Sequence, residues 1–374
     1  MDTLGIYIHI PFCIRKCNYC DFCSFPKSDK TDMYAYVDEL CRRICDFSPK
    51  AEDRAVDTVY FGGGTPTLLS YECFEQLMNT LKSSFKICDD AEITVECNPA
   101  SIDKAGLGRL KSLGINRLSI GLQSANANEL SSLGRLHSFD DFVSIYNDAR
   151  AVGFDNISVD LMYGIPEQTA KSFENTLRKV CSLSPEHISA YGLKIEEGTV
   201  FAAIEDKLNL PDEDEEYRMY CLCENILLEH GYKRYEISNF SKAGKESRHN
   251  LRYWNLGDYI GFGVAAHSCF GGERFGNSRD IKAFLRGEDI TAERYVIGHS
   301  ERIAEYVMLG LRLERGISLD EYKQITGRDM KEDFSMISQY VSEGFFRESK
   351  GRIAFTTKGL FVSNAILSQM LSFE

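Results

Sequence analysis

Three cysteines crowd a short stretch near the N-terminus, Cys13-Ile-Arg-Lys-Cys17-Asn-Tyr-Cys20. Three thiols cannot all pair as disulfides, and thiolates are soft ligands that favour iron–sulfur clusters, zinc or Cu(I). A structural zinc site takes four ligands, commonly two Cys-x-x-Cys pairs or histidines at matching spacing, and no second pair follows here. A 4Fe–4S cluster on three thiolates leaves one iron open to a further ligand. We therefore predict that Cys13, Cys17 and Cys20 bind a 4Fe–4S cluster.

Cys23 lies just beyond this loop and resembles a fourth ligand. A fourth thiolate would fill the open iron, so we interpret Cys23 as a free thiol near the cluster. The competing interpretation of the whole loop is a set of incidental thiols, because the chain has 13 cysteines.

A glycine-rich segment, Gly62-Gly63-Gly64-Thr65-Pro66, follows a predicted strand and precedes a predicted helix. Glycine lets backbone groups approach a ligand closely. The segment has neither the glycine order of a dinucleotide-binding fingerprint nor the Gly-Lys ending of a P-loop. Alone it is compatible with a simple tight turn, but behind the cysteine loop it indicates a ligand-binding turn.

Four polar residues, Glu96, Gln123, Arg135 and Asp160, have the chemistry that a zwitterion bearing a ribose requires. Arginine pairs with a carboxylate through two parallel hydrogen bonds. Glutamate, glutamine and aspartate accept hydrogen bonds from hydroxyl groups. Each residue taken alone is equally compatible with a helix cap or a solvated loop charge.

His249 begins the segment His249-Asn-Leu-Arg-Tyr-Trp254. An imidazole on a polar loop beside two aromatic rings could ligate a haem iron while the rings pack on the porphyrin. The alternative, which chemistry alone favours, is a structural aromatic hinge. His137 and His267 are weaker candidates.

Six predicted strands alternate with predicted helices in the first half of the chain. This alternation favours a parallel sheet closed by crossover helices, and a partial (β/α)6 barrel fits it. In such barrels the chemistry lies at the carboxyl ends of the strands, where the cysteine loop, the glycine segment, Glu96, Gln123 and Asp160 all fall. The strands are expected at Leu4–Ile10, Ala55–Phe61, Glu92–Cys97, Arg117–Leu122, Asn156–Met162 and His187–Leu193.

We divide the chain into three parts: a barrel at 1–205, an extension with the HNLRYW loop at 206–298, and a C-terminal domain at 299–374. In the extension, 232–240 is expected to be one strand-like run. The last part is predicted to be a small α+β domain of winged-helix type, with helices, a strand pair near Gly351 and a terminal helix. Because the chain is acidic, a structural or protein-binding role is expected for this domain rather than DNA binding.

The composition limits the classes of function. The chain has 374 residues and a formal net charge of −13, which argues against a general nucleic-acid-binding protein. No apolar run approaches the ~20 residues of a membrane span. The N-terminus lacks the pattern of a signal peptide, and the odd number of cysteines is typical of a reducing compartment. We therefore expect a cytoplasmic protein.

The assembled motifs resemble the oxygen-independent coproporphyrinogen III oxidase-like family of radical S-adenosylmethionine (SAM) proteins, and most closely its branch of haem chaperones. The resemblance covers nearly the whole chain. It is carried in order by YIHIPFCIRKCNYCDF, YFGGGTPT, VECNP, RLSIGLQS, LGRLHS, ISVDLMYGIPEQT and HNLRYW.

The resemblance implies a 4Fe–4S cluster whose open iron binds SAM, and a bound haem. It implies His249 as a haem-binding residue, because the chaperone branch is similar in its HNxxYW motif. It also implies apo-haemoprotein recipients and an electron donor, and it leaves room for a homodimer and a peripheral membrane contact. The residues that it places around SAM are Tyr7, Tyr19, Gly63, Gly64, Thr65, Glu96, Gln123, Arg135 and Asp160.

Two departures separate the sequence from the oxidases that it resembles. In those enzymes a single residue separates the third cysteine from a fourth (CxxxCxxCxC), whereas this chain has Phe22 at that position, and they have a longer N-terminal arm. We therefore expect a haem chaperone that delivers haem to apo-haemoproteins. The alternatives are an oxidase that decarboxylates coproporphyrinogen, or another radical SAM enzyme that acts on a tetrapyrrole or an unrelated substrate.

Overall fold

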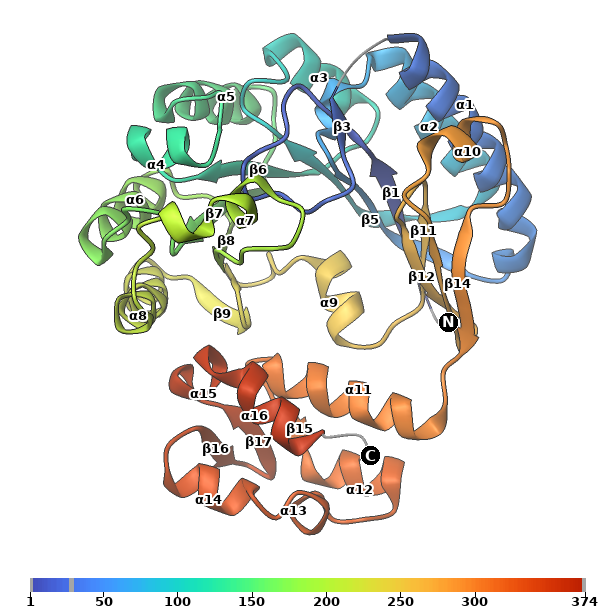
Figure 1. Cartoon of the computed structure of the whole chain (residues 1–374). Coiled ribbons are helices and arrows are strands. Elements are labelled where there is room, and N and C mark those ends of the chain that lie inside the picture. Colours follow the sequence, from blue (N-terminus) through green and yellow to red (C-terminus); the bar gives the residue numbers. More distant parts are fainter. Residues whose placement is uncertain (1–2, 27–29, 372–374) are drawn as a thin grey trace.

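The computed structural model describes residues 3–26 and 30–371. Within these residues, twelve strands form one sheet in the order β14-β13-β12-β11-β1-β4-β5-β6-β7-β8-β10-β9 (Figure 1). Helices cover its outer face, and a smaller domain lies beside the barrel at the C-terminal end of the chain.

The six predicted barrel strands are present and parallel, which confirms the expected α/β class. Their apolar side chains are buried on both faces of the sheet, as parallel sheets require. The strands are β1 (Thr3–Ile10), β4 (Ala55–Gly63), β5 (Lys86–Cys97), β6 (Arg117–Gln123), β7 (Ile157–Tyr163) and β8 (His187–Gly192).

Helices connect these strands on the outside of the barrel. Side-chain caps define several helix starts: Ser70, Asp103, Ser138 and Thr169 each accept a hydrogen bond from a backbone amide in the first turn. The barrel helices are α1 (Lys30–Phe47), α2 (Tyr71–Ser84), α3 (Lys104–Ser112), α4 (Ala127–Ser132), α5 (Phe139–Ala151), α6 (Ala170–Leu183) and α7 (Val200–Ala203).

One strand is longer than the sequence pattern indicated. We expected β5 to begin at Glu92, but it begins at Lys86. The polar pair Asp89 and Asp90 interrupts the apolar pattern there, whereas the backbone of Ile87 still pairs with Val56 of β4. Backbone pairing at a sheet edge does not require apolar side chains, so hydropathy missed this part of the strand.

The extension adds strands to both ends of the barrel sheet. β9 and β10 follow β8, while β11, parallel to β1, begins an antiparallel run that ends at β14. Our single run at 232–240 is wrong, because two strands form there. The elements are α8 (Glu213–Glu229), β9 (Lys233–Glu236), β10 (Asn239–Ser241), α9 (Arg248–Trp254), β11 (Tyr259–Phe262), β12 (His267–Phe270), β13 (Glu273–Asn277), α10 (Ile281–Leu285) and β14 (Thr291–Val296).

The C-terminal domain has its own apolar core and a three-stranded sheet, β15-β17-β16. The order of helices, strand pair and terminal helical segment matches the predicted winged-helix-like order, although the single terminal helix that we predicted is divided into two helices at Val362. In Figure 1 its first helix, α11, faces the barrel on the side of α9. The elements are α11 (His299–Arg312), β15 (Ile317–Ser318), α12 (Leu319–Thr326), α13 (Met330–Asp333), α14 (Ile337–Ser342), β16 (Phe346–Ser349), β17 (Arg352–Phe355), α15 (Thr357–Phe361) and α16 (Ser363–Met370).

Among the residues that the structure describes, no helix is both long enough and apolar enough to span a membrane.

Candidate functional site

A cavity of about 520 Å³ opens at the carboxyl ends of the barrel strands. It has the size of a small-molecule site. Of the thirteen residues predicted from the sequence, all but Tyr7 and His249 line it. These eleven are Cys13, Cys17, Cys20, Tyr19, Gly63, Gly64, Thr65, Glu96, Gln123, Arg135 and Asp160.

The cysteine loop is held at the cavity by short pairings on either side. β2 (Phe12–Cys13) pairs with β3 (Phe25–Pro26), and the amide of Asn18 donates to the carbonyl of Leu133 at 3.0 Å. These contacts close the loop over residues 13–26 and turn its three thiols toward one space. The loop is therefore positioned by backbone bonds from two separate segments.

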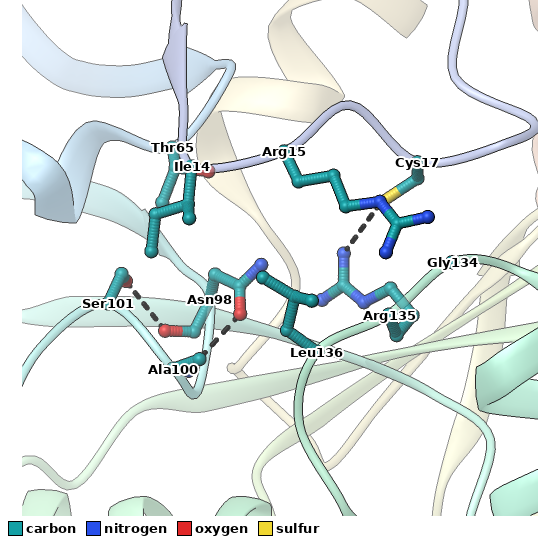
Figure 2. Close-up of a pocket in the computed structure, with 10 residues that line it drawn as sticks. All are labelled: Ile14, Arg15, Cys17, Thr65, Asn98, Ala100, Ser101, Gly134, Arg135 and Leu136. Carbon is teal, nitrogen blue, oxygen red and sulfur yellow. Dashed lines mark hydrogen bonds between the residues drawn. The ribbon is translucent and has the colours of Figure 1, made fainter. Parts of the chain in front are cut away.

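Two side chains from elsewhere in the barrel donate to the cysteine sulfurs. Thr65 Oγ1 lies 3.6 Å from Cys13 Sγ. Arg135 Nη1 lies 3.5 Å from Cys17 Sγ, as Figure 2 shows. Such donors stabilise thiolates, and hydrogen bonds to sulfur are one of the means by which proteins tune iron–sulfur clusters. The loop thus has the partners that cluster-bound thiolates require.

The donor set fits a multi-iron cluster. Burial raises the pKa of Cys13 and raises that of Cys20 to about 11, so both are thiols at neutral pH until a metal ion displaces the proton. The described residues contain no group of three His, Cys, Asp or Glu side chains arranged around a single ion. A 4Fe–4S cluster does not require three ligands around one ion, because each thiolate binds a different iron atom.

The backbone of the glycine segment mainly holds in place the residues that precede the cysteine loop. The amides of Gly64 and Thr65 donate to the carbonyls of Ile10 and Phe12, each at 2.8 Å. A Cβ on Gly64 would lie 2.7 Å from the carbonyl oxygen of Phe12, so a larger residue would push the cysteine loop away. This supporting role was not evident from the sequence, which indicated only close approach to a ligand.

Glu96 is a buried carboxyl group on the cavity wall. It accepts hydrogen bonds from Tyr60 Oη at 2.9 Å and from the amide of Gly63 at 3.0 Å. Burial raises the pKa of Glu96 to about 7, and the nearby charge of Asp160 acts in the same direction. Glu96 is therefore poised to change its charge near neutral pH, or to be held ionised by a cationic ligand.

Asp160 and Arg135 place opposite charges in the same cavity. Burial raises the pKa of Asp160, although Ser119 donates to its carboxylate at 3.0 Å. Arg135 Nη2 donates to the carbonyl of Gly121 at 2.5 Å, whereas its buried Nε has no hydrogen-bond partner among the described residues. A zwitterionic ligand would find both a cation and carboxyl groups here.

Tyr7 acts behind the cavity wall. Its hydroxyl bonds to His9 Nδ1 at 2.9 Å, and His9 Nε2 bonds to the carbonyl of Cys23 at 2.8 Å. The ring of Tyr7 stacks on Tyr60, with centroids 6.2 Å apart. Tyr7 and His9 thus connect β1 to the end of the cysteine loop, and sequence reasoning missed His9.

His249 differs from our expectation in its setting. The HNLRYW segment is not a polar loop but the helix α9, capped by Ser247, and only 1% of the surface of His249 is exposed. Its Nδ1 bonds to Thr58 Oγ1 at 2.9 Å and its Nε2 to Tyr253 Oη at 2.7 Å. Neither nitrogen is available to an iron in this conformation.

His249 instead supports the wall of the large cavity. Its ring stacks on Tyr60, with centroids 5.1 Å apart and planes at 25°, and Tyr60 in turn holds Glu96. Burial lowers the pKa of His249 to about 3, so the imidazole is neutral. The segment reaches the cavity through Asn250, the next residue.

Several lining residues were not singled out from the sequence. For those on the barrel strands, alternation was the available signal, since every second residue of a barrel strand faces inward; Asn98 follows β5 and Asn250 lies on α9, where no such signal exists. The missed lining residues include Tyr60, Asn98, Arg117, Ser119, Met162, Ser189, Tyr191 and Asn250.

Comparison with known proteins identifies the family. Residues 7–180 match the model of the radical SAM superfamily, and residues 297–362 match that of the HemN C-terminal domain. The chain is 36% identical to a Bacillus subtilis protein named "Heme chaperone HemW", over 98% of both chains. It is 34% identical to a Haemophilus influenzae protein of the same name, over 100% of this chain and 99% of the relative. The chain belongs to the HemW family.

Membership of the HemW family agrees with the fold. The structure matches that of the Escherichia coli coproporphyrinogen III oxidase HemN, described as a radical SAM enzyme, with a TM-score of 0.86. The match covers 99% of this chain and 90% of that one at 24% identity, so it shows a shared fold. The radical SAM superfamily implies a 4Fe–4S cluster and SAM, and the cavity holds residues suited to both.

Proposed function

We propose that the protein is a haem chaperone that carries a SAM-bound 4Fe–4S cluster and delivers haem to apo-haemoproteins. The observation that carries this proposal is likeness along 98% of the chain to relatives named haem chaperones. The cavity adds support, because residues suited to a cluster and to SAM line one space.

In this proposal Cys13, Cys17 and Cys20 would hold the cluster, which would leave one iron available to SAM. Glu96 accepts a hydrogen bond from the SAM amino group, and Arg135 stabilises the Cys17 thiolate. Asp160 and Gln123 face the ribose. Tyr19, the residue before Cys20, packs beside the adenine.

The remaining partners follow from the same proposal. A reductant for the cluster is required, and delivery implies apo-haemoprotein recipients. We also propose a cytoplasmic location, and we retain a homodimer and a peripheral membrane contact as proposals. The net charge of −13 gives no support to nucleic-acid binding.

In this proposal, His249 could bind the haem iron only if its side chain first moved, because both of its ring nitrogens are hydrogen-bonded. The imidazole would have to leave Thr58 or Tyr253 before it could ligate an iron. Leaving Thr58 would also disturb the stacking on Tyr60. A His249→Ala variant is therefore expected to affect SAM binding as well as any haem binding.

A radical SAM enzyme acting on a tetrapyrrole is the second candidate. The observation that favours it is the extent of the cavity, which continues past the predicted SAM residues to Arg117, Ser189 and Tyr191. A propionate side chain that undergoes oxidative decarboxylation could reach Arg117. Against coproporphyrinogen oxidase itself stands Phe22, which occupies the place of the fourth cysteine of those enzymes.

Anaerobic haem titration of the cluster-loaded protein tests the chaperone proposal. We expect a Soret band that saturates near one haem per chain in the wild type and in His230→Ala, an exposed control. A protein that binds no haem but converts propionate to vinyl groups would contradict the proposal. Measuring SAM affinity in His249→Ala on the same samples shows whether that residue acts on the SAM side.

A further inference from the structure

The large cavity continues below the residues that we expect to bind SAM. Arg117 is the first residue of β6 and Gln123 is its last, so about 20 Å of strand separates them at the usual rise of about 3.3 Å per residue. Both residues line the cavity. Gln123 lies at the carboxyl end of the strand, whereas Arg117 lies at the opposite end of the barrel. The side chain of Arg117 therefore forms part of the cavity floor.

Arg117 is a buried cation without a partner in the chain. Only 2% of its surface is exposed, and its Nε has no hydrogen-bond partner among the described residues. No ion pair joins its guanidinium to a carboxylate in the part of the chain that the structure describes. A buried charge is normally paired, because an unpaired charge away from water is strongly destabilising. An anion bound in the cavity would supply the missing partner.

The buried carboxyl groups of the cavity are bonded elsewhere. Both carboxylate oxygens of Asp160, on the neighbouring strand β7, lie within hydrogen-bond distance of Ser119 Oγ, at 3.0 and 3.1 Å. Glu96 accepts a hydrogen bond from Tyr60 Oη at 2.9 Å. Neither carboxyl group forms an ion pair with Arg117 within the described residues. The guanidinium of Arg117 is therefore available to a ligand.

The charges around the floor favour a carboxylate over a phosphate. One guanidinium matches one carboxylate through two parallel hydrogen bonds. A doubly charged phosphate would need a second cation, but the other cations that line the cavity belong to the cysteine loop, as Arg15 and Lys16 do, or bond to it, as Arg135 does. Asp160 lines the same space and would repel a second negative charge.

The walls beside Arg117 offer apolar surface to the rest of a ligand. Tyr60 pairs in register with Thr94, and Thr94 pairs with Arg117, so these three residues lie in one row across the sheet. Met162 of β7 and Tyr191 of β8 also line the cavity. Sites with aromatic and aliphatic walls and one well-placed charged group are typical of small organic ligands. A small monocarboxylic acid with an apolar body fits this combination.

We propose that Arg117 marks a second ligand subsite at the floor of the cavity, which binds the carboxylate of a small organic acid while SAM occupies the residues above. This inference rests on the proposed binding of SAM at the cluster. It goes beyond the proposed chaperone function, because the acid is a ligand separate from haem. A residue that lowers stability in the unliganded protein is typical of a binding site.

The test measures the binding of butyrate and of benzoate to full-length, cluster-loaded protein saturated with SAM, by ligand-observed NMR under anaerobic conditions. We expect one of these acids to saturate near one molecule per chain. Arg117→Met should weaken that binding at least tenfold, because the variant lacks the cation. Arg117→Lys should retain part of the affinity, and inorganic phosphate should bind more weakly than the acid.

Thermal unfolding separates a ligand-binding role from a structural one. Without an added acid, Arg117→Met should raise the melting temperature, because an apolar side chain replaces an unpaired buried charge. Arg234 is the matched control: 5% of its side chain is exposed, it pairs with Glu224 at 3.4 Å and with Glu314 at 3.2 Å, and it does not line the cavity. Arg234→Met should lower the melting temperature and leave acid binding unchanged. A lower melting temperature in Arg117→Met would assign that residue a structural role and overturn the inference.

The binding results can also overturn the inference, and they are distinguishable from a failure of the chaperone proposal. Equal affinities in the wild type and Arg117→Met would place the acid elsewhere, and displacement of SAM by the acid would place it among the SAM residues. Binding of neither acid, or tighter binding of phosphate, would show that the subsite or its ligand class is wrong. All of these results leave the chaperone proposal standing, whereas a wild type that binds no haem contradicts that proposal instead. If the wild type binds no SAM, the proposed SAM site and this inference fail together.

Discussion

Four cysteines at the barrel mouth are close in sequence but differ in surroundings. Cys13, Cys17 and Cys20 line the large cavity, and the first two accept hydrogen bonds from Thr65 and Arg135. Cys23 is buried away from the cavity, where its carbonyl bonds to His9. At the residue scale, this difference separates the three proposed cluster ligands from Cys23, which we interpret as a free thiol.

We predict that Cys17→Ala loses most of its iron after anaerobic reconstitution, along with the brown colour of the cluster. Cys17 is chosen because its sulfur already faces Arg135, so its loss removes both a ligand and the group that Arg135 stabilises. Iron content and the visible spectrum measure the effect. Cys23→Ala is the matched control and should keep its iron. Full retention by Cys17→Ala would contradict the three-thiolate assignment.

The raised pKa of Glu96 predicts that protein stability and SAM affinity both depend on pH. Its pKa is raised from 4.5 to about 7 in the fold, so the folded protein holds this proton more tightly than the unfolded chain. Its contribution to stability is therefore present at low pH and is lost as pH rises from about 4.5 to 7. If the ionised carboxylate binds the SAM amino group, SAM affinity should rise about tenfold between pH 6 and pH 8.

The pH prediction has a matched control in Glu236. This carboxyl group is also buried, with its pKa raised to about 7, but it does not line the cavity. Glu96→Gln should flatten the pH dependence of SAM affinity measured by calorimetry, whereas Glu236→Gln should keep it. An unchanged profile in Glu96→Gln would show that another group titrates.

At the scale of elements, the buried side chain of Arg252 helps to hold α9 against the barrel. Arg252 Nη1 donates to the carbonyl of Thr3 at 2.9 Å, and its Nη2 pairs with Asp57. Only 9% of its side chain is exposed. A Cβ on Gly5 would lie 2.5 Å from Arg252 Cδ, so the absence of a side chain on Gly5 admits the arginine.

We predict that Arg252→Ala lowers the free energy of unfolding by about 3 kcal/mol, because it leaves the partly buried Asp57 without its closest cation. Urea unfolding measures this change. Arg248 provides the comparison: it also reaches Asp57, at 3.7 Å, but 41% of its side chain is exposed. Arg248→Ala should cost less than about 1 kcal/mol. Equal losses in the two variants would contradict the view that Arg252 anchors α9.

The elements also show what the sequence could predict. The six barrel strands were found because each is an apolar run that ends at a glycine or polar residue. The cysteine loop and Glu96 were found because their chemistry is distinctive and they follow such strands. The sequence could not show that HNLRYW is helical, because a seven-residue helix with mixed polarity has no clear periodicity. It also could not show that long-range pairing adds β11 beside β1.

At the scale of the whole molecule, the extension and the C-terminal domain together line a second cavity, of about 310 Å³, that no single segment contains. α11 supplies Arg302, Glu305 and Met308, while β12 supplies His267. These residues are far apart in the sequence from the cysteine loop, and α11, β11, β12 and β13 all contribute to the lining of their cavity. Only the assembled fold brings such groups together.

The most direct test of the account is to measure haem and SAM binding on one sample of cluster-loaded protein, by titrating each ligand in the presence of saturating amounts of the other. A chaperone that carries haem while SAM stays bound at the cluster predicts that one haem and one SAM bind per chain at the same time. Neither ligand should displace the other. Competition between haem and SAM would contradict the account, because it would place a tetrapyrrole in the SAM cavity, as a radical enzyme acting on a porphyrinogen requires.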